Sequence, residues 1–201
     1  ESNHNLNVGL EARLLDRIDL SFEFYNRKTT DMLLSYPLAS SSGFDSYYRN
    51  SGEMRNRGIE FAVTGRIFDR RDFQWSVTWM GSTVRNKVLK LTEDGKDIIG
   101  STQIIREGET LYSYYVARSA GVDPMTGEKM YWATDKDGND YITKSTTVAQ
   151  ANRVIAGSRI PDLYGSLSTS LRWKNLDFSI STNYSIGGKN YDGVYYEFMS
   201  C

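Results

Sequence analysis

The sequence has little of the side-chain chemistry on which enzymes, metal proteins and nucleic-acid-binding proteins depend. Its single cysteine, Cys201, offers neither a disulfide framework nor a cysteine metal cluster. The one histidine, His4, stands without neighbours that would complete a hydrolytic triad or a histidine metal pair. The formal net charge is −1, so the chain also lacks the basic character typical of nucleic-acid-binding proteins. We therefore expect no catalytic site, no cofactor, no bound metal and no nucleic-acid partner.

Long apolar runs are missing as well. No stretch approaches the roughly eighteen consecutive apolar residues that a membrane-spanning helix needs. The chain has aromatic residues instead, 13% of the total, with 14 Tyr and 4 Trp. Such residues suit the interfacial girdles of membrane β-barrels and the loops of sugar-binding or peptide-binding sites alike.

Six segments alternate apolar and polar residues with a period of two, which is the period of a β-strand whose successive side chains point to opposite faces. The clearest one places Trp75, Val77 and Trp79 on one face and uncharged polar residues between them. In all six, charge falls on the opposite face only. The predicted strands cover residues 6–14, 18–28, 58–68, 72–82, 163–173 and 176–186.

The length and the spacing of these segments favour a wall between lipid and water. A strand of about ten residues tilted by roughly 40° crosses a bilayer core, whereas strands of soluble proteins cluster near five or six residues. Tight turns at 15–17, 69–71 and 174–175 are predicted to alternate with long extracellular loops at 29–57 and 83–162, as in outer-membrane barrels. The predicted lipid-facing residues are Leu10, Phe22, Phe24, Phe61, Trp75, Val77, Trp79, Leu167, Leu171, Phe178 and Ile180.

Six strands are too few to close a membrane barrel, which needs about eight. Open edges would expose unpaired backbone groups to lipid, at a cost of several kcal/mol per group. We therefore expect an all-β, antiparallel barrel fragment that other strands complete. Two alternatives remain open: a soluble β-sandwich that binds carbohydrate through its tyrosines, since soluble antiparallel sheets also alternate, and a passive porin-type barrel.

The predicted loops are rich in residues suited to ligand binding. Tyrosine combines a flat apolar ring with a hydroxyl group, so it can stack on a sugar or peptide and also hydrogen-bond to it. The alternative for each such residue is packing within the loop itself. Candidate substrate contacts are Tyr47, Tyr48, Tyr112, Tyr114, Tyr115, Tyr131 and Trp132.

A group of acidic residues at 135–140 partly matches a calcium-binding loop. The pattern fails at its closing position, where Thr146 stands in place of the required glutamate. The flanking segments 130–132 and 141–143 are rich in β-forming residues, so a hairpin that turns at Asp137 and Gly138 is the preferred interpretation.

Several motifs, taken in order, resemble the SusC/RagA family of TonB-dependent outer-membrane transporters. Residues 50–60 carry an asparagine, glycine and glutamate run ahead of a strand, as in the C-terminal barrel region of that family. Further matches lie at 86–91, 107–109, 120–127, 160–166 and 184–192. No single motif is specific, but their order and spacing on two-faced strands span nearly the whole chain.

The resemblance implies a late part of a plugged barrel of about twenty-two strands, so that residues 1–201 form part of one C-terminal barrel domain. The plug and the TonB-contacting segment would lie upstream and outside this chain. Implied partners are a SusD-like surface lipoprotein lid, the TonB complex, outer-membrane lipid and an oligosaccharide or peptide substrate. The implied function is TonB-dependent import of an oligomeric nutrient across the outer membrane of a Gram-negative cell.

Overall fold

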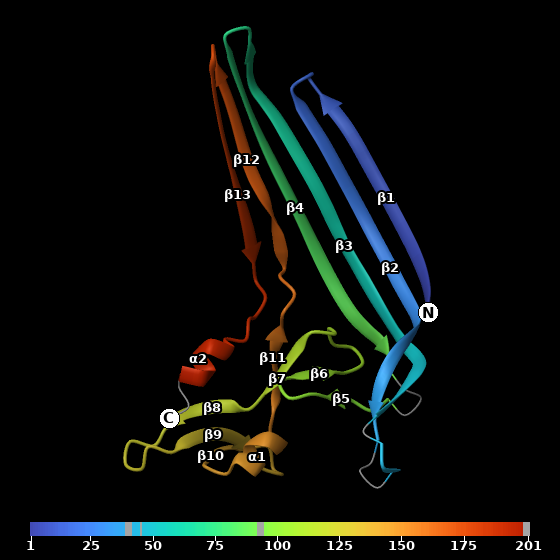
Figure 1. Ribbon diagram of the computed structural model, residues 1–201, viewed down its shortest axis with the longest axis vertical. Helices are drawn as coiled ribbons and strands as arrows, with labels where there is room; N and C mark the ends of the chain where they lie inside the picture. Colours follow the sequence, from blue (N-terminus) through green and yellow to red (C-terminus); the bar gives the residue numbers. More distant parts are fainter. Residues whose placement is uncertain (39–41, 45, 92–94, 199–201) are drawn as a thin grey trace.

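The main element of the structure is a single six-stranded antiparallel sheet with the strand order β1-β2-β3-β4-β12-β13. The computed structural model describes residues 1–38, 42–44, 46–91 and 95–198, so Cys201 lies outside the described residues. Figure 1 shows the sheet as a tall, curved layer. Its strands are β1 (Ser2–Leu14), β2 (Ile18–Pro37), β3 (Ser46–Arg70), β4 (Phe73–Lys90), β12 (Leu163–Trp173) and β13 (Leu176–Ile186). The predicted all-β, antiparallel barrel fragment is confirmed, and the described residues leave it open at β1 and β13.

Tight turns join the strands at one end of the sheet, uppermost in Figure 1. Between β1 and β2, Leu15 and Asp16 both have positive φ, at 52° and 53°. The Arg17 N–H donates to the Leu14 carbonyl at 3.1 Å, which closes the turn. Paired positive φ angles are typical of type I′ hairpin turns, whose twist matches that of the flanking strands. The ends of β12 and β13 coincide with those predicted, and so does the turn at 174–175 between them.

The long loop predicted at 29–57 is wrong, because most of it is strand. β2 and β3 remain paired from Thr29 with Met54 as far as Pro37 with Ser46, through a bulge near Met32. β4 likewise continues to Lys90. The alternation of apolar and polar residues predicts which side chains would face lipid, and we expect it to stop where the lipid stops. Backbone pairing does not depend on lipid, so the strands run on beyond it.

Residues between β4 and β12 form a folded region, here called the loop region, at the opposite end from the tight turns (Figure 1). It contains a four-stranded sheet ordered β11-β7-β6-β5 and a three-stranded sheet ordered β10-β9-β8. A short helix α2 (Gly193–Phe198) follows β13. The elements of the loop region are β5 (Ile98–Ile99), β6 (Gln103–Ile105), β7 (Ser113–Val116), β8 (Arg118–Val122), β9 (Lys129–Thr134), β10 (Asp140–Thr143), α1 (Thr146–Ala151) and β11 (Val154–Ser158).

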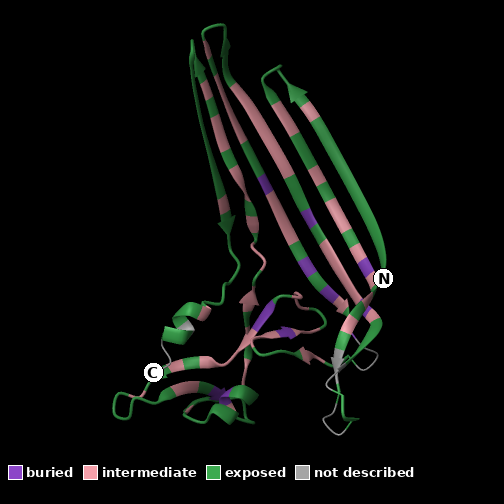
Figure 2. Ribbon diagram, in the orientation of Figure 1, coloured by how far each residue is buried: buried purple, intermediate pink, exposed green. Residues whose placement is uncertain are grey.

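The small packed core lies where the sheet meets the loop region. Val88, Leu91 and Ile104 have no exposed surface. Figure 2 shows exposed and intermediate residues along most of the main sheet, with buried residues gathering toward its loop end and in the loop region. The main sheet is therefore not built around a water-excluding core of its own. None of the described helices has the length and apolar character needed to cross a membrane.

Candidate functional site: two faces of a wall and its loop region

One face of the main sheet is apolar across all six strands. Phe22 pairs with Leu10 on one side and with Phe61 on the other, and paired residues of an antiparallel sheet point the same way. We call this the outer face. All eleven residues predicted to face lipid lie on it, and their contact with lipid stays a prediction: Leu10, Phe22, Phe24, Phe61, Trp75, Val77, Trp79, Leu167, Leu171, Phe178 and Ile180.

The outer face is open rather than packed. Leu10 is 67% exposed, Leu167 46% and Phe178 52%. Soluble monomers rarely leave contiguous apolar surface on this scale. A β-sandwich would bury such a face beneath a second sheet, whereas the described residues leave these side chains exposed. The exposed outer face of the described residues therefore does not fit the soluble β-sandwich alternative.

Polar atoms on the outer face find partners within the sheet. The indole N–H of Trp75 donates to Thr169 Oγ1 at 2.9 Å. The indole N–H of Trp79 donates to the Tyr184 hydroxyl at 2.9 Å, and that hydroxyl donates to the Met80 carbonyl at 2.9 Å. Lipid tails offer no hydrogen bonds, so a polar group that meets them must be satisfied internally. These pairings fit a face in contact with hydrocarbon.

Alongside the apolar residues of the outer face, the charges of the main strands lie on the opposite, inner face. Near the tight turns, Asp19 accepts hydrogen bonds from Arg13 at 2.5 Å and from Arg66 at 2.6 Å, across three strands. Arg172 donates to Asp177 at 2.8 Å between β12 and β13. Ionised groups of this kind are costly in lipid and are tolerated toward a water-filled or protein-filled interior. The inner face is thus suited to line a lumen.

The loop region is anchored to the inner face through Asn86. Its side chain is 8% exposed and donates from Nδ2 to Asn56 Oδ1 at 2.7 Å. Its Oδ1 accepts from the backbone N–H of Leu111 at 2.7 Å. In addition, the Val88 N–H donates to the Glu109 carbonyl at 2.9 Å. Residues 109–111 of the loop region are therefore held beside the end of β4, a role for Asn86 that sequence reasoning missed.

The candidate substrate contacts in and beside β7 differ in how far their side chains are buried. Tyr114 is only 7% exposed and packs within the loop region. Two guanidinium groups lie over the ring of Tyr115, that of Arg106 at 5.9 Å and that of Arg153 at 4.9 Å from the ring centroid. Cations over the faces of a tyrosine ring are attracted by its quadrupole. Tyr112, at 45% exposed, keeps accessible ring surface. Arg106 precedes Tyr115 and Arg153 follows it from a separate segment, and sequence spacing alone did not identify either partner.

The remaining aromatic candidates lie on other elements. Tyr131 and Trp132 are neighbours on β9 and point to opposite faces of the three-stranded sheet. Tyr47 and Tyr48 lie at the N-terminal start of β3, in the part of the β2-β3 hairpin farthest from the tight turns. Tyr48 is 70% exposed. The seven predicted contacts are therefore spread over three structural units and do not form one pocket. Their contact with substrate stays a prediction.

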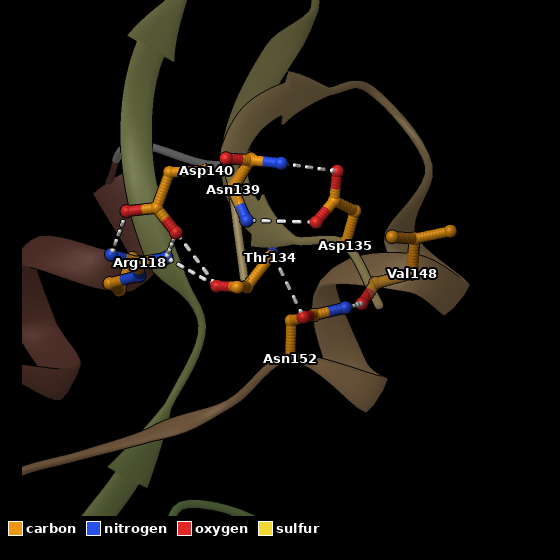
Figure 3. A network of polar contacts seen from close by, with 7 residues as sticks. All are labelled: Arg118, Thr134, Asp135, Asn139, Asp140, Val148 and Asn152. Carbon is orange, nitrogen blue, oxygen red and sulfur yellow. Dashed lines mark hydrogen bonds and ion pairs between the residues drawn. The ribbon is translucent and has the colours of Figure 1, made fainter. Parts of the chain in front are cut away.

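The predicted hairpin at Asp137 and Gly138 is confirmed, since β9 pairs with β10 around it. Figure 3 shows why the acidic residues do not converge. Asp135 accepts from the backbone N–H groups of Asp137 at 2.9 Å and Asn139 at 2.8 Å. Asp140 turns the other way and binds Arg118 through both carboxylate oxygens, at 2.8 and 2.9 Å. These carboxylates serve turn geometry and an ion pair.

The pKa values of two carboxyl groups in the three-stranded sheet and its turn predict how the stability of this sheet depends on pH. Arg118 and Thr134 lower the pKa of Asp140 from 3.8 to about 2, and Lys144 with the Met125 N–H does the same for the pKa of Asp123. A lowered pKa contributes stability that is present above pH 3.8 and lost as pH falls toward 2. We expect β8 to β10 to lose protection in this window, measured by hydrogen exchange corrected for intrinsic rates. Asp140→Asn should weaken the pH dependence, and equal protection at both ends of the window would contradict this prediction.

Together, the apolar outer face, the polar inner face and the anchored loop region define a piece of the wall of a membrane-spanning β-barrel. A family model described as "TonB dependent receptor-like, beta-barrel" matches residues 1–198. TonB-dependent receptor P3 of Formosa agariphila is 34% identical over 94% of this chain and 21% of its own length. TonB-dependent receptor SusC of Bacteroides thetaiotaomicron is 26% identical over 96% of this chain and 20% of its own length.

Solved structures give the same result. The RagAB peptide importer in its closed-closed state superposes with a TM-score of 0.80 and 29% identity, over 92% of this chain and 21% of that one. The RagAB peptide transporter gives a TM-score of 0.78 and 30% identity over 92% of this chain. The chain belongs to the TonB-dependent receptor β-barrel family, and it is similar to the SusC and RagA members. It spans about a fifth of the length of these relatives.

Proposed function

We propose that the whole protein is an outer-membrane importer of a Gram-negative cell, driven through TonB, and that this chain is part of its wall and loops. The observation that supports this most is the separation of an apolar outer face from a charged inner face in a chain of the TonB-dependent receptor family. The wall would be anchored by apolar burial in lipid. Its inner face would surround a plug supplied by the rest of the protein, and no catalytic step is needed.

The cargo we propose is an oligomeric nutrient, either a glycan or a peptide. RagAB, one of the structures that this chain resembles, is described as a peptide importer. The loop region presents exposed aromatic rings and guanidinium groups, which stack on and hydrogen-bond to either kind of oligomer. By analogy with SusC-like transporters, we further propose a SusD-like surface lipoprotein as a lid over the loop end. The TonB complex would act on the upstream plug.

The test begins with gentle detergent extraction of outer membranes that contain the full-length protein. Mass spectrometry of the intact complex should detect a surface lipoprotein bound to it. Uptake of labelled oligosaccharides and oligopeptides, with and without the energised TonB complex, would identify the cargo. Uptake that continues at the same rate without TonB would instead support the passive porin-type barrel, and a detergent-independent soluble product would overturn both proposals.

Trp132→Ala tests a proposed substrate contact. Trp132 is 37% exposed on β9, and removing a stacked indole should weaken cargo binding by about three- to ten-fold, the effect of about 0.5–1.5 kcal/mol for an aromatic pair. Isothermal titration of the full-length protein with its transported oligomer measures this. Met125→Ala is the matched control, since Met125 is 90% exposed at the turn of the same sheet. Equal effects of the two substitutions would argue against a specific contact.

A further inference from the structure

The outer face changes from apolar to basic at the loop end of the sheet. Arg57 pairs with Arg85, and Arg55 pairs with Lys87, in a register that is unbroken back to Phe61 with Gly81. Alternate residues of a strand share a face, so the side chains of Arg55 and Arg57 lie on the face of Phe61. We call four residues the outer basic cluster: Arg55, Arg57, Arg85 and Lys87.

The cluster places like charges directly opposite one another. Arg57 faces Arg85 across the strand pair and Arg55 faces Lys87, an arrangement that destabilises a sheet when nothing compensates it. Lys28 pairs with Arg55 from the other side and has a partner in Glu53 at 2.8 Å. No described residue forms an ion pair or side-chain hydrogen bond with any of the four cluster cations. Their charges are uncompensated within the described structure.

The same four cations help to line a hollow of about 270 Å³ between the end of the main sheet and the loop region. Its other lining residues are Val84, Asn86, Gly108, Thr110, Ser158, Ile160, Pro161 and Asp162. Arg57, Arg85 and Lys87 are exposed, and Arg55 is half-buried. Asp162 is the one acidic residue that lines the hollow. Guanidinium groups bind phosphate oxygens through two parallel hydrogen bonds, and a lysine adds a point charge. The hollow is therefore chemically suited to a phosphate group.

We propose that the outer basic cluster binds the phosphate groups of an anionic lipid in the outer leaflet of the membrane. We choose a lipid as the ligand because the cluster borders the apolar outer face. On the same face, the next cross-strand pair toward the tight turns is Ile59 with Thr83, and the apolar outer face continues beyond it. A lipid with its phosphate in the hollow would lay its acyl chains along that face. The proposal rests on the assignment of the outer face to lipid and does not depend on TonB-driven import.

The experiment uses the full-length protein in detergent and a synthetic glucosamine disaccharide lipid that carries two phosphates. Arg57→Gln, Arg85→Gln and Lys87→Gln are combined in one variant. Each charge near an anionic membrane surface changes binding by roughly five-fold, so the triple variant should bind the lipid on the order of 100-fold more weakly by native mass spectrometry. Raising ionic strength from about 0.05 to 0.5 M should weaken parental binding, because exposed charges are screened.

A second triple variant, with Arg17, Arg70 and Arg71 changed to Gln, removes the same charge at the tight-turn end and should bind as the parent does. Recovery of both variants in the membrane fraction separates failure of this proposal from failure of the barrel assignment. Three results would overturn the proposal. They are equal losses in the two variants, equal parental binding of the dephosphorylated lipid, and displacement of the lipid by inorganic phosphate at an equal concentration.

Discussion

Leu167→Arg is expected to cost about 2–4 kcal/mol of folding free energy in the membrane, the penalty of a cation near the bilayer midplane of a barrel. Leu167 lies in the middle of β12 on the outer face, paired with Trp79 and Thr182, and is 46% exposed. If the outer face meets lipid, an arginine there would have hydrocarbon around it, and its paired positions Trp79 and Thr182 offer no acidic partner. The amount of full-length protein assembled in the outer membrane, read from its heat-modifiable migration on gels, should fall sharply.

Ser166→Arg is the matched control, one residue away and on the inner face. Ser166 lines the same hollow as Glu23 and Glu60, so a new guanidinium group there has carboxylates beside it. We expect nearly parental assembly for this variant. If both arginines were tolerated equally, the outer face would not meet lipid. If both were equally damaging, the effect would come from crowding and not from the membrane.

Gly165→Ala is expected to destabilise the barrel wall by about 1–3 kcal/mol, the usual cost of overpacking. A Cβ atom at Gly165 would lie 2.0 Å from the Met80 carbonyl oxygen and 2.8 Å from the Tyr184 hydroxyl. That hydroxyl links Trp79 to the Met80 carbonyl, so the methyl group would have to displace a backbone group and break a bonded pair. The side chain of Tyr184 thus covers Gly165 on the neighbouring strand and fills the space that a side chain at Gly165 would occupy.

The control for this prediction is Gly65→Ala, also within the main sheet. Nothing lies within 4 Å of a Cβ atom added at Gly65. Alanine reduces the freedom of the unfolded chain, so stability should stay unchanged or rise by up to about 1 kcal/mol. Denaturant unfolding of the full-length protein in detergent measures both variants. A loss at Gly65 as large as that at Gly165 would contradict the steric explanation.

The sequence was most informative for strands that keep one apolar face and one polar face along their whole length. Period-two alternation from Leu163 to Ile186 predicted β12 and β13 with their bounds, because successive residues there lie alternately on the apolar outer face and the polar inner face. The same reasoning ended β2 too early, at residue 28. Beyond that point the strand still pairs with β3 through a bulge near Met32, but its residues no longer alternate between apolar and polar, so the pattern carries no signal.

The candidate site was less predictable, because its geometry depends on contacts between distant segments. Tyrosine content indicated ring surface for a ligand, but only the fold distinguishes the packed Tyr114 from the exposed Tyr48. Tyr115 acquires its two arginine partners from segments on either side of it in sequence. In the sequence, the motif at 50–60 contributed to the family resemblance, while the fold shows that two of its arginines oppose cations of β4.

The sequence by itself determined that this chain is a two-faced, antiparallel wall with tight turns at one end, because the alternation of side chains along a strand is a local property. It also indicated the family, because the order and spacing of the motifs can be read from the sequence without a structure. Only the tertiary structure decided where the strands end, how the loop region is anchored through Asn86, and which cations gather beside the apolar band. Those features follow from strand register and long-range pairing, which join residues that no local pattern connects.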